Sequence, residues 1–208
     1  MKMRIGVIFG AQTVEHEVSI ISAIQAMKAI DETKYDIVPI YITKEKEWYT
    51  GKLLMDIENY QDLDNLKRYA KNVVLYNKEG RFVLQSKRGL RLNVDEIDMA
   101  FPIVHGVNAE DGTVQGYLEL LGIPYVGSDL YAGVVGQDKV FMKQIFESSK
   151  LPITKYVWFF DSEYKENNNE VINKIKKLQL PVIIKPAKLG SSVGINRVSR
   201  EEDLNEAI

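Results

Sequence analysis

Cysteine is absent from this chain of 208 residues, and histidine occurs only twice. The lack of cysteine excludes a disulfide framework and a thiolate site, and it fits a reducing compartment. Two histidines, with no cysteine and no His-Glu-x-x-His sequence, cannot supply the ligands of a tetrahedral zinc site. We therefore expect no metal-ligating residues in this stretch of sequence.

Long apolar runs and a strong charge of either sign are also missing. No segment is long enough to span a bilayer, and the apolar run that follows Arg4 is too short for a signal peptide and is broken by glycine. The formal net charge of -2 argues against a general partner in nucleic acid or an anionic membrane. We therefore expect a cytoplasmic protein that binds neither nucleic acid nor membranes.

The chain has enough apolar residues, 45%, to bury a substantial core in one or two domains. A β-α-β opening favours a parallel sheet, with strands at 4–9 and 36–43 around a helix near 20–30. A third buried strand is expected at 97–104. The βα rhythm restarts near residues 125–136. We predict an α/β fold with an open parallel-sheet N-terminal domain, 1–128, followed by the start of a second domain, 129–208.

The remaining segments carry weaker patterns. Residues 53–66 are left unassigned. The other predicted elements are an edge strand at 47–49, a surface hairpin from 73–76 and 82–85, strands at 124–127 and 155–160, a connector of small residues at 128–136, helices near 114–121, 137–149 and 170–178, and a last helix capped by Ser199.

The stretch from Leu180 to Val198 is the most informative part of the sequence. Three consecutive β-branched residues, 182–184, indicate a strand buried on both faces, and Lys185 follows near its end. A lysine in such a strand is costly to bury unless an anion meets it. The alternative is a hairpin with a polar tip, in which Lys185 extends to water.

A glycine and serine loop follows Lys185. Gly190 and Gly194 bracket Ser191 and Ser192, and they allow the backbone to turn its amides toward one point, as in a phosphate cradle. The run 190–194 also matches G-x-S-x-G formally. A β-prone segment follows it instead of a helix, and both histidines lie upstream, so we exclude the hydrolase interpretation.

Three further residues are candidates for chemistry. Glu15 and His105 each follow a predicted strand, at the edge where open α/β sheets bind ligands. Lys139 begins a helix, where a cation is unfavourable unless an anion is bound nearby. The alternatives are a helix-stabilising carboxylate for Glu15, a structural histidine for His105 and a solvated lysine for Lys139. Two lysines and the serine loop imply a polyphosphate, although the two common nucleotide-binding glycine motifs are absent.

Four ordered stretches contain these candidate residues: Phe9 to Ser19, His105 to Gly116, Asp138-Lys139, and Ile184-Lys185-Pro186 with Gly190 to Gly194. Together they resemble the D-alanine–D-alanine ligase family, of the ATP-grasp superfamily. Two departures are Ala11, where the family usually has a second glycine, and Gln137, where methionine is usual; neither removes a functional group. The resemblance implies a substrate-binding domain over 1–128 and the first part of an ATP-grasp domain over 129–208.

The resemblance implies an ATP-dependent and Mg²⁺-dependent enzyme that joins two D-alanines through a D-alanyl phosphate for peptidoglycan. Glu15 would hold the ammonium group of the first D-alanine, and His105 would lie beside its reacting carboxyl. Ser191 would tie Glu15 to a closing loop. Lys139 and Lys185 would contact the ATP phosphates, with the amides around Ser191 and Ser192 covering them.

The family is commonly dimeric, so a homodimer is expected. Its Mg²⁺ ligands and closing loop follow the segment that ends here, so these 208 residues alone are expected to be inactive. Two alternatives stay open: a ligase that makes D-Ala-D-lactate or D-Ala-D-serine, and a non-catalytic binding or dimerisation fragment.

Overall fold

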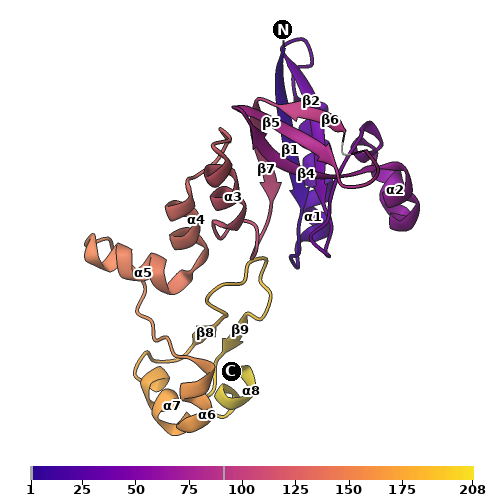
Figure 1. Cartoon of the computed structure of the whole chain (residues 1–208). Helices are drawn as coiled ribbons and strands as arrows, with labels where there is room; N and C mark the ends of the chain where they lie inside the picture. Colours follow the sequence, from indigo (N-terminus) through magenta and orange to yellow (C-terminus); the bar gives the residue numbers. More distant parts are fainter. Residues whose placement is uncertain (1, 91) are drawn as a thin grey trace. The chain divides into compact units, whose positions relative to one another are not determined.

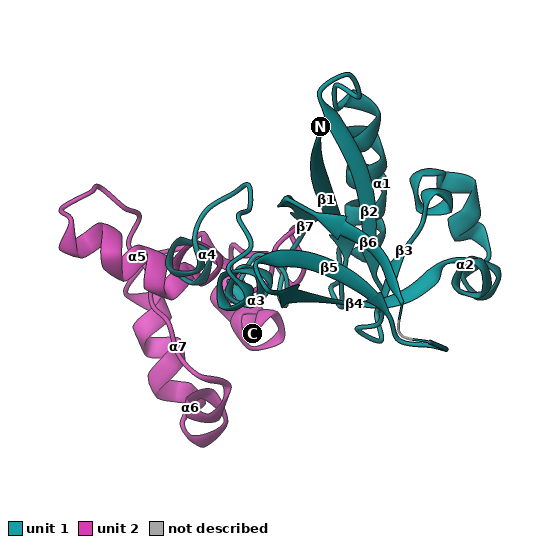
Figure 2. Ribbon diagram, turned by 45° about the horizontal axis from the view of Figure 1, so that its top comes forward, with its two compact units in different colours: residues 1–134 teal, residues 135–208 magenta. Residues whose placement is uncertain are grey.

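The computed structural model describes residues 2–90 and 92–208. The chain divides into two compact units, residues 1–134 and 135–208, and the division falls within α4 (Leu130–Gln137) (Figure 2). Within the described residues, no helix combines the length and the apolar character needed to cross a membrane.

The first unit is built on a seven-stranded sheet, in the order β6-β5-β4-β3-β2-β1-β7 over its described residues (Figure 1). The strands are β1 (Met3–Gly10), β2 (Tyr35–Ile42), β3 (Trp48–Thr50), β4 (Lys71–Lys78), β5 (Arg81–Ser86), β6 (Asn93–Ile97) and β7 (Met99–Val104). The helices are α1 (His16–Ala29), α2 (Leu63–Tyr69) and α3 (Thr113–Leu121), with 3-10 helices at Lys52–Met55 and Ile57–Gln61.

The sheet is parallel at one end and antiparallel at the other. Strand β1 pairs in parallel with β2 and β7, as the β-α-β opening predicts, whereas the pairs from β2 to β6 are antiparallel. The predicted edge strand is β3, which instead lies between β2 and β4. The predicted surface hairpin is also wrong in its placement, because β4 and β5 are interior strands with buried Leu75 and Leu84.

The two faces of the sheet bury different helices because successive side chains of a strand point to opposite faces. On one face, Val7 and Phe9 of β1 belong to the same apolar cluster as Ala23 of α1. On the other face, Ile8 packs in a cluster that includes Leu118 of α3. Each of these larger side chains contributes about 1.5–3 kcal/mol when fully buried. The two helices therefore hold the carboxyl end of β1 between them.

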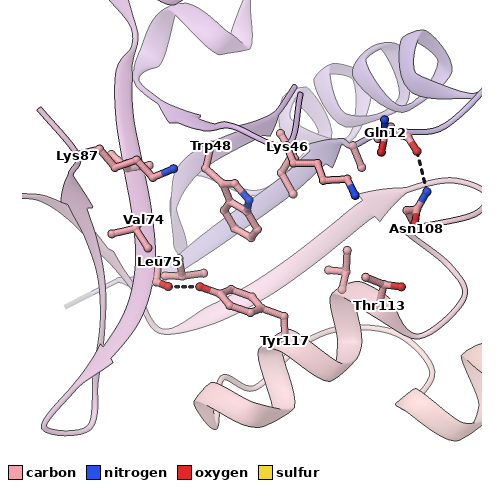
Figure 3. Close-up of a pocket in the computed structure, with 13 residues that line it drawn as sticks. Gln12, Lys46, Trp48, Val74, Leu75, Lys87, Asn108, Thr113 and Tyr117 are labelled. Carbon is pink, nitrogen blue, oxygen red and sulfur yellow. Dashed lines mark hydrogen bonds between the residues drawn. The ribbon is translucent and has the colours of Figure 1, made fainter. Parts of the chain in front are cut away.

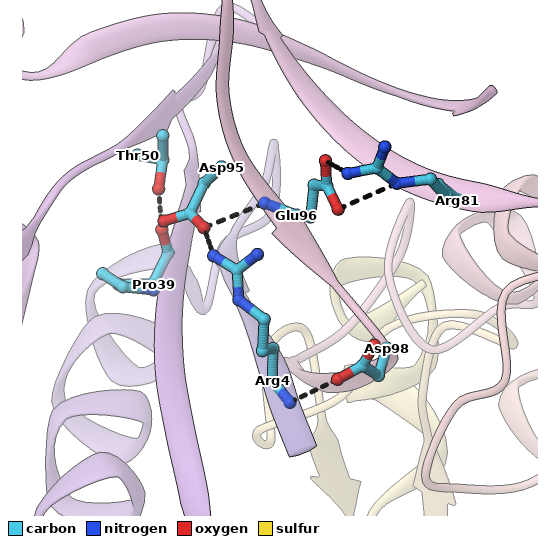
Figure 4. A network of polar contacts seen from close by, with 7 residues as sticks. All are labelled: Arg4, Pro39, Thr50, Arg81, Asp95, Glu96 and Asp98. Carbon is cyan, nitrogen blue, oxygen red and sulfur yellow. Dashed lines mark hydrogen bonds and ion pairs between the residues drawn. The ribbon is translucent and has the colours of Figure 1, made fainter. Parts of the chain in front are cut away.

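Strands β6 and β7 are the two edges of the sheet, yet only Asp98 separates them in the chain. The sheet must therefore curl until β6 approaches β1. Gly6 permits this approach, since a Cβ atom there would lie 2.8 Å from Cδ1 of Ile97. Polar contacts fix the curl: Arg4 forms an ion pair with Asp95, and its backbone N–H donates to Asp98 Oδ2 at 2.7 Å (Figure 4).

Three further predictions for the first unit need correction. The single strand at 97–104 is interrupted at Asp98, where the chain changes edge. The strand at 124–127 is reduced to one bridge between Tyr125 and Ala100, because Gly127 has a φ of 130° and ends the extended run. The connector at 128–136 contains α4, whose small residues include Gly133, close to the backbone of Glu110.

The second unit is smaller and mixed. Its elements are α5 (Lys139–Ser148), α6 (Asp161–Glu166), α7 (Asn168–Lys176), β8 (Val182–Ile184), β9 (Asn196–Val198), the 3-10 helix Glu201–Asp203 and α8 (Leu204–Ala207). Strands β8 and β9 form an antiparallel pair. Val171, Ile175 and Leu204 are the centre of its apolar core.

Two elements of this unit differ from the sequence prediction. Residues 155–160 form no strand, because no described strand pairs with them. Ser199 does not cap the last helix; Arg200 precedes the 3-10 turn and Asp203 precedes α8. The predicted helices at 137–149 and 170–178 are confirmed as α5 and α7 with shifted ends.

Candidate functional site

Glu15 lies where β1 gives way to α1, and its carboxylate points at the segment that follows β7. A Cβ atom on Gly106 would lie 2.6 Å from Glu15 Oε2, so the carboxylate occupies the space that the glycine leaves open. Glu15 is the N-cap residue of α1, but its side chain makes no capping hydrogen bond. The carboxylate therefore does not cap the helix by hydrogen bonding, but it lies at the positive end of α1, so a helix-stabilising role stays an alternative.

His105 precedes this glycine, and its two ring nitrogens have different surroundings. Nδ1 lies 3.8 Å from Glu110 Oε1. Nε2 is buried and has no hydrogen-bond partner among the described residues. An unsatisfied buried polar atom is uncommon in folded proteins and needs an explanation, of which a ligand atom is one. Glu110 also accepts from the backbone N–H of Gly106 at 2.9 Å, so one carboxylate orders both neighbours.

Buried polar contacts hold the loop that carries Glu15. His16, 2% exposed, contacts the carbonyl oxygen of Ala11 through Nδ1 at 2.6 Å and the hydroxyl of Tyr41 through Nε2 at 3.0 Å. Burial raises the pKa of Tyr41, so its hydroxyl keeps its proton. Ser19 donates to Ile103 O at 2.5 Å and accepts from the N–H of Gly10 at 2.7 Å. These contacts join the ends of β1, β2 and β7 beneath Glu15.

In the second unit, Lys139 begins α5 and reaches the loop that follows β8. Its ammonium donates to the carbonyl oxygens of Leu189 at 2.6 Å and Ala187 at 3.3 Å. Its backbone N–H also donates to Ala187 O at 3.0 Å, and Gln137 donates to Lys188 O at 2.9 Å. Lys139 is therefore not a solvated lysine, because its partly buried side chain is tied to the glycine and serine loop.

Lys185 lies close enough to Lys139 to affect its titration. Burial, followed by the positive charge of Lys185, lowers the pKa of Lys139 below its ordinary value of 10.5, and Asp138 opposes this shift. Both ammonium groups line one cavity of about 490 Å³, whose walls include Trp158 and Ile184. The structure therefore brings the two predicted lysines together, in a place where an anion would relieve their mutual repulsion.

Lys185 was predicted as a site residue because the strand before it was expected to be buried on both faces, and that expectation is wrong. Strand β8 is not buried on both faces: Ile183 is 55% exposed, and Lys185 itself is exposed. A two-stranded sheet with one helical layer buries only one face, so the β-branched run was a poor guide to burial. The Lys185 side chain is therefore accessible to a ligand, and no anion is needed to offset a cost of burying its charge.

The loop after Lys185 takes an unusual backbone path. Ser191, Ser192 and Gly194 have φ values of 48°, 62° and 68°. Gly190 and Gly194 were predicted to let the backbone turn here, and the left-handed conformation falls on Ser191, Ser192 and Gly194. A non-glycine residue with positive φ costs of order 1–3 kcal/mol, and such strain is concentrated at ligand-binding sites. Both serines are exposed.

The described residues contain no group of three or more His, Cys, Asp or Glu side chains arranged to hold a metal ion. No magnesium ligand is therefore assigned among the described residues.

Comparison with known proteins identifies the family. A family model described as "D-ala D-ala ligase N-terminus" matches residues 4–128, and one described as "D-ala D-ala ligase C-terminus" matches residues 145–208. The chain belongs to the D-alanine–D-alanine ligase family. A D-alanine–D-alanine ligase from Thermosipho melanesiensis is 39% identical over 208 residues, which are 99% of this chain and 55% of that protein.

Solved ligase structures share the fold. The D-alanine–D-alanine ligase from Coxiella burnetii has a TM-score of 0.83 and 28% identity, over 99% of this chain and 57% of that one. The VanG D-Ala:D-Ser ligase from Enterococcus faecalis has a TM-score of 0.81 and 31% identity, over 100% of this chain and 59% of that one. The predicted α/β fold that leads into an ATP-grasp domain is thus confirmed. The chain spans about half the length of the relatives it matches.

Two residues that contact the candidate site residues or their loop were missed by sequence reasoning. Glu110 orders His105 and Gly106, and its only signal was a carboxylate five positions after the histidine in a turn-forming stretch. His16 was passed over beside Glu15, because its partner Tyr41 is 25 positions away in sequence.

Proposed function

We propose that the protein carrying this chain joins two D-alanines at the expense of ATP, through a D-alanyl phosphate, for peptidoglycan synthesis. Family membership gives the reaction class. The observation that carries the assignment is the close approach of the Glu15 carboxylate to Gly106, next to a histidine whose Nε2 is buried and has no hydrogen-bond partner among the described residues. This pairing offers an anion for an ammonium group and a nitrogen for a carboxyl, the two charged ends of an amino acid.

Each group in the first unit has a distinct task in this proposal. Glu15 binds the ammonium group of the first D-alanine. His105 lies with Nδ1 3.8 Å from Glu110, and its Nε2 is the nitrogen that faces the reacting carboxyl in this proposal. Residues 1–128 form the domain that binds this substrate.

The second unit supplies the phosphate contacts, and residues 129–208 form the first part of the ATP-grasp domain. When bound, ATP supplies the phosphoryl group that activates the carboxyl of the first D-alanine, so that the amine of the second can displace phosphate. Lys139 and Lys185 neutralise phosphate charge beside the cavity that they line. Ser192 and the neighbouring amides cover the phosphates. Ser191 acts with Glu15 in substrate binding.

Three further assignments follow from the family and the reaction. Mg²⁺ accompanies ATP and neutralises the charge of its phosphates. The consumption of ATP places the enzyme in the cytoplasm. A homodimer is the assembly proposed, and sedimentation of the purified protein tests it.

A second substrate other than D-alanine is the strongest competing function, because the E. faecalis relative is named a D-Ala:D-Ser ligase at 31% identity. The test is a ligation assay with D-alanine as first substrate and D-alanine, D-serine or D-lactate as second, with the products separated by mass spectrometry. We expect D-Ala-D-Ala as the main product. A preference for D-serine or D-lactate would replace the proposal by the competing one.

A matched pair of variants tests the site itself. Glu15→Gln should raise the KM for D-alanine by about tenfold or more, because the charge partner of the ammonium group is lost. Glu17→Gln is the control, since Glu17 pairs with Lys44 on the surface. Wild-type KM in Glu15→Gln would overturn the assignment. If ATP and D-alanine produce no thermal stabilisation, the non-catalytic alternative is favoured.

A further inference from the structure

The first unit contains a cavity of about 350 Å³ whose described lining residues do not include Glu15 or His105 (Figure 3). It lies between α3 and the strands β2, β3 and β4, on the face of the sheet opposite α1. Its volume falls within the range of small-molecule sites. The proposed ligation uses none of its residues. Its apolar walls are formed by Ile42, Trp48, Val73, Leu75, Val114 and Tyr117.

Two aromatic rings shape this cavity in advance. The ring centroids of Trp48 and Tyr117 lie 5.5 Å apart, at an interplanar angle of 57°. The hydroxyl of Tyr117 donates to the carbonyl oxygen of Leu75, which fixes the ring against β4. A bound apolar group would therefore meet rigid walls and would not have to order them first.

The charged residues that line the cavity are both lysines. Lys46 and Lys87 come from different turns, and in Figure 3 their ammonium groups extend from either side of Trp48. Neither forms an ion pair with a described residue, although the nearby Lys44 and Lys67 do. Among the described residues, no Asp or Glu lines the cavity. An apolar cavity with cations at its mouth, in a chain of net charge -2, is complementary to an amphiphilic anion.

We propose that this cavity binds a small monoanion with a flat apolar body, such as an aromatic carboxylate. The body would lie against the rings of Trp48 and Tyr117, which already contact each other, and the carboxylate would face Lys46 and Lys87. Free D-alanine does not fit this description, because its ammonium group would find no carboxylate here and its methyl group would leave most of the volume empty. The site is thus distinct from the one proposed for ligation.

Trp48 provides a direct readout of occupancy. The chain has two tryptophans, so Trp158→Phe leaves Trp48 as the only one. The probes are 4-butylbenzoate, the neutral 4-butylbenzyl alcohol and the cationic 4-butylbenzylammonium, titrated against Trp48 emission without ATP or D-alanine. We expect saturable changes, with the carboxylate bound about fivefold or more tighter than the alcohol and the ammonium weakest.

Charge variants locate the anion. Lys46→Gln and Lys87→Gln should each weaken binding of the carboxylate by about two- to fivefold and leave the alcohol unchanged. Lys28→Gln, at an exposed position on α1, is the matched control and should bind all three probes as the parent does. Equal affinity for the three probes, no response of Trp48, or full carboxylate affinity in the double lysine variant would overturn the proposal. Because the readout is binding at Trp48, failure of the ligation assay does not affect it.

Discussion

Gly106 lies so close to Glu15 that a Cβ atom on the glycine would be 2.6 Å from the carboxylate oxygen Oε2. Its φ of 77° is also in the left-handed region. Glycine is therefore required at position 106 for two reasons. Its backbone has a positive φ, and the side chain of Glu15, 91 residues earlier in the sequence, leaves no room for a Cβ atom.

Gly106→Ala should lower the free energy of unfolding by about 1–2 kcal/mol through its φ, and displace Glu15 as well. We expect the KM for D-alanine to rise about tenfold. Gly89→Ala is the control, since Gly89 has a φ of 71° with open space around it. It should share the loss of stability in denaturant unfolding but keep the KM of the parent. A normal KM in Gly106→Ala would contradict the close contact.

Tyr41→Phe tests whether the contact of His16 with Tyr41 positions Glu15. Removal of the hydroxyl leaves His16 Nε2 buried without its partner, at a cost of about 1–3 kcal/mol. We expect a higher KM for D-alanine with an unchanged KM for ATP, measured by initial rates. Tyr69→Phe, at a position 67% exposed, should change neither. If both Michaelis constants rise together in Tyr41→Phe, the role of the contact is only structural.

The charge of Lys185 should control the titration of Lys139. Because the folded-state pKa of Lys139 is lowered, the unfolded chain holds this proton to higher pH. The stability lost by burying the charged lysine should be regained as the pH rises from the lowered pKa toward 10.5. Lys185→Gln should raise the pKa of Lys139. The pH above which ATP affinity falls should rise with it.

NMR titration of lysine labelled with ¹³C at Cε measures this directly, with Lys139→Arg assigning the signal. Lys150→Gln, an exposed lysine in the same unit, is the control for a general change of charge. A Lys139 signal that titrates identically in the parent and in Lys185→Gln would show that the two ammonium groups do not interact.

Asp138→Ala should destabilise the second unit. The Asp138 carboxylate accepts from the N–H groups of Val140 at 2.9 Å and Phe141 at 3.3 Å, so it caps α5. Loss of such a cap costs about 0.5–2 kcal/mol. Unfolding followed by Trp158 emission, in a Trp48→Phe background, measures this unit alone. Asp138→Asn keeps an acceptor oxygen and should retain most of the stability, whereas equal losses in both variants would contradict a role based on the hydrogen bonds.

The elements that depend on local pattern were predicted well. The apolar run of β1, the amphipathic α1 and the helices α3, α5 and α7 are each specified by residues close in sequence. The placement of β3, β4 and β5 inside the sheet was not predictable in this way. It depends on pairing with strands far along the chain, which leaves no periodic signal in the strand itself.

For the candidate site, the motifs indicated Glu15, His105, Lys139, Lys185 and the two serines, whose catalytic and binding roles stay predictions. What surrounds them came from the structure. Ala11 is an example: the sequence showed only a missing glycine, whereas its φ of 71° shows that alanine is held in the conformation glycine would adopt. Its carbonyl oxygen is needed there by His16.

The sequence by itself determined the α/β class, the family and the residue types at the site, because these follow from local periodicity and from motifs short enough to read directly. The tertiary structure alone decided that Gly106 makes room for Glu15, that Glu110 orders His105, and that the carbonyls of Ala187 and Leu189 hold Lys139 near Lys185. Each of these contacts joins residues that different elements carry, so it exists only after the chain has folded and cannot be read from either segment alone.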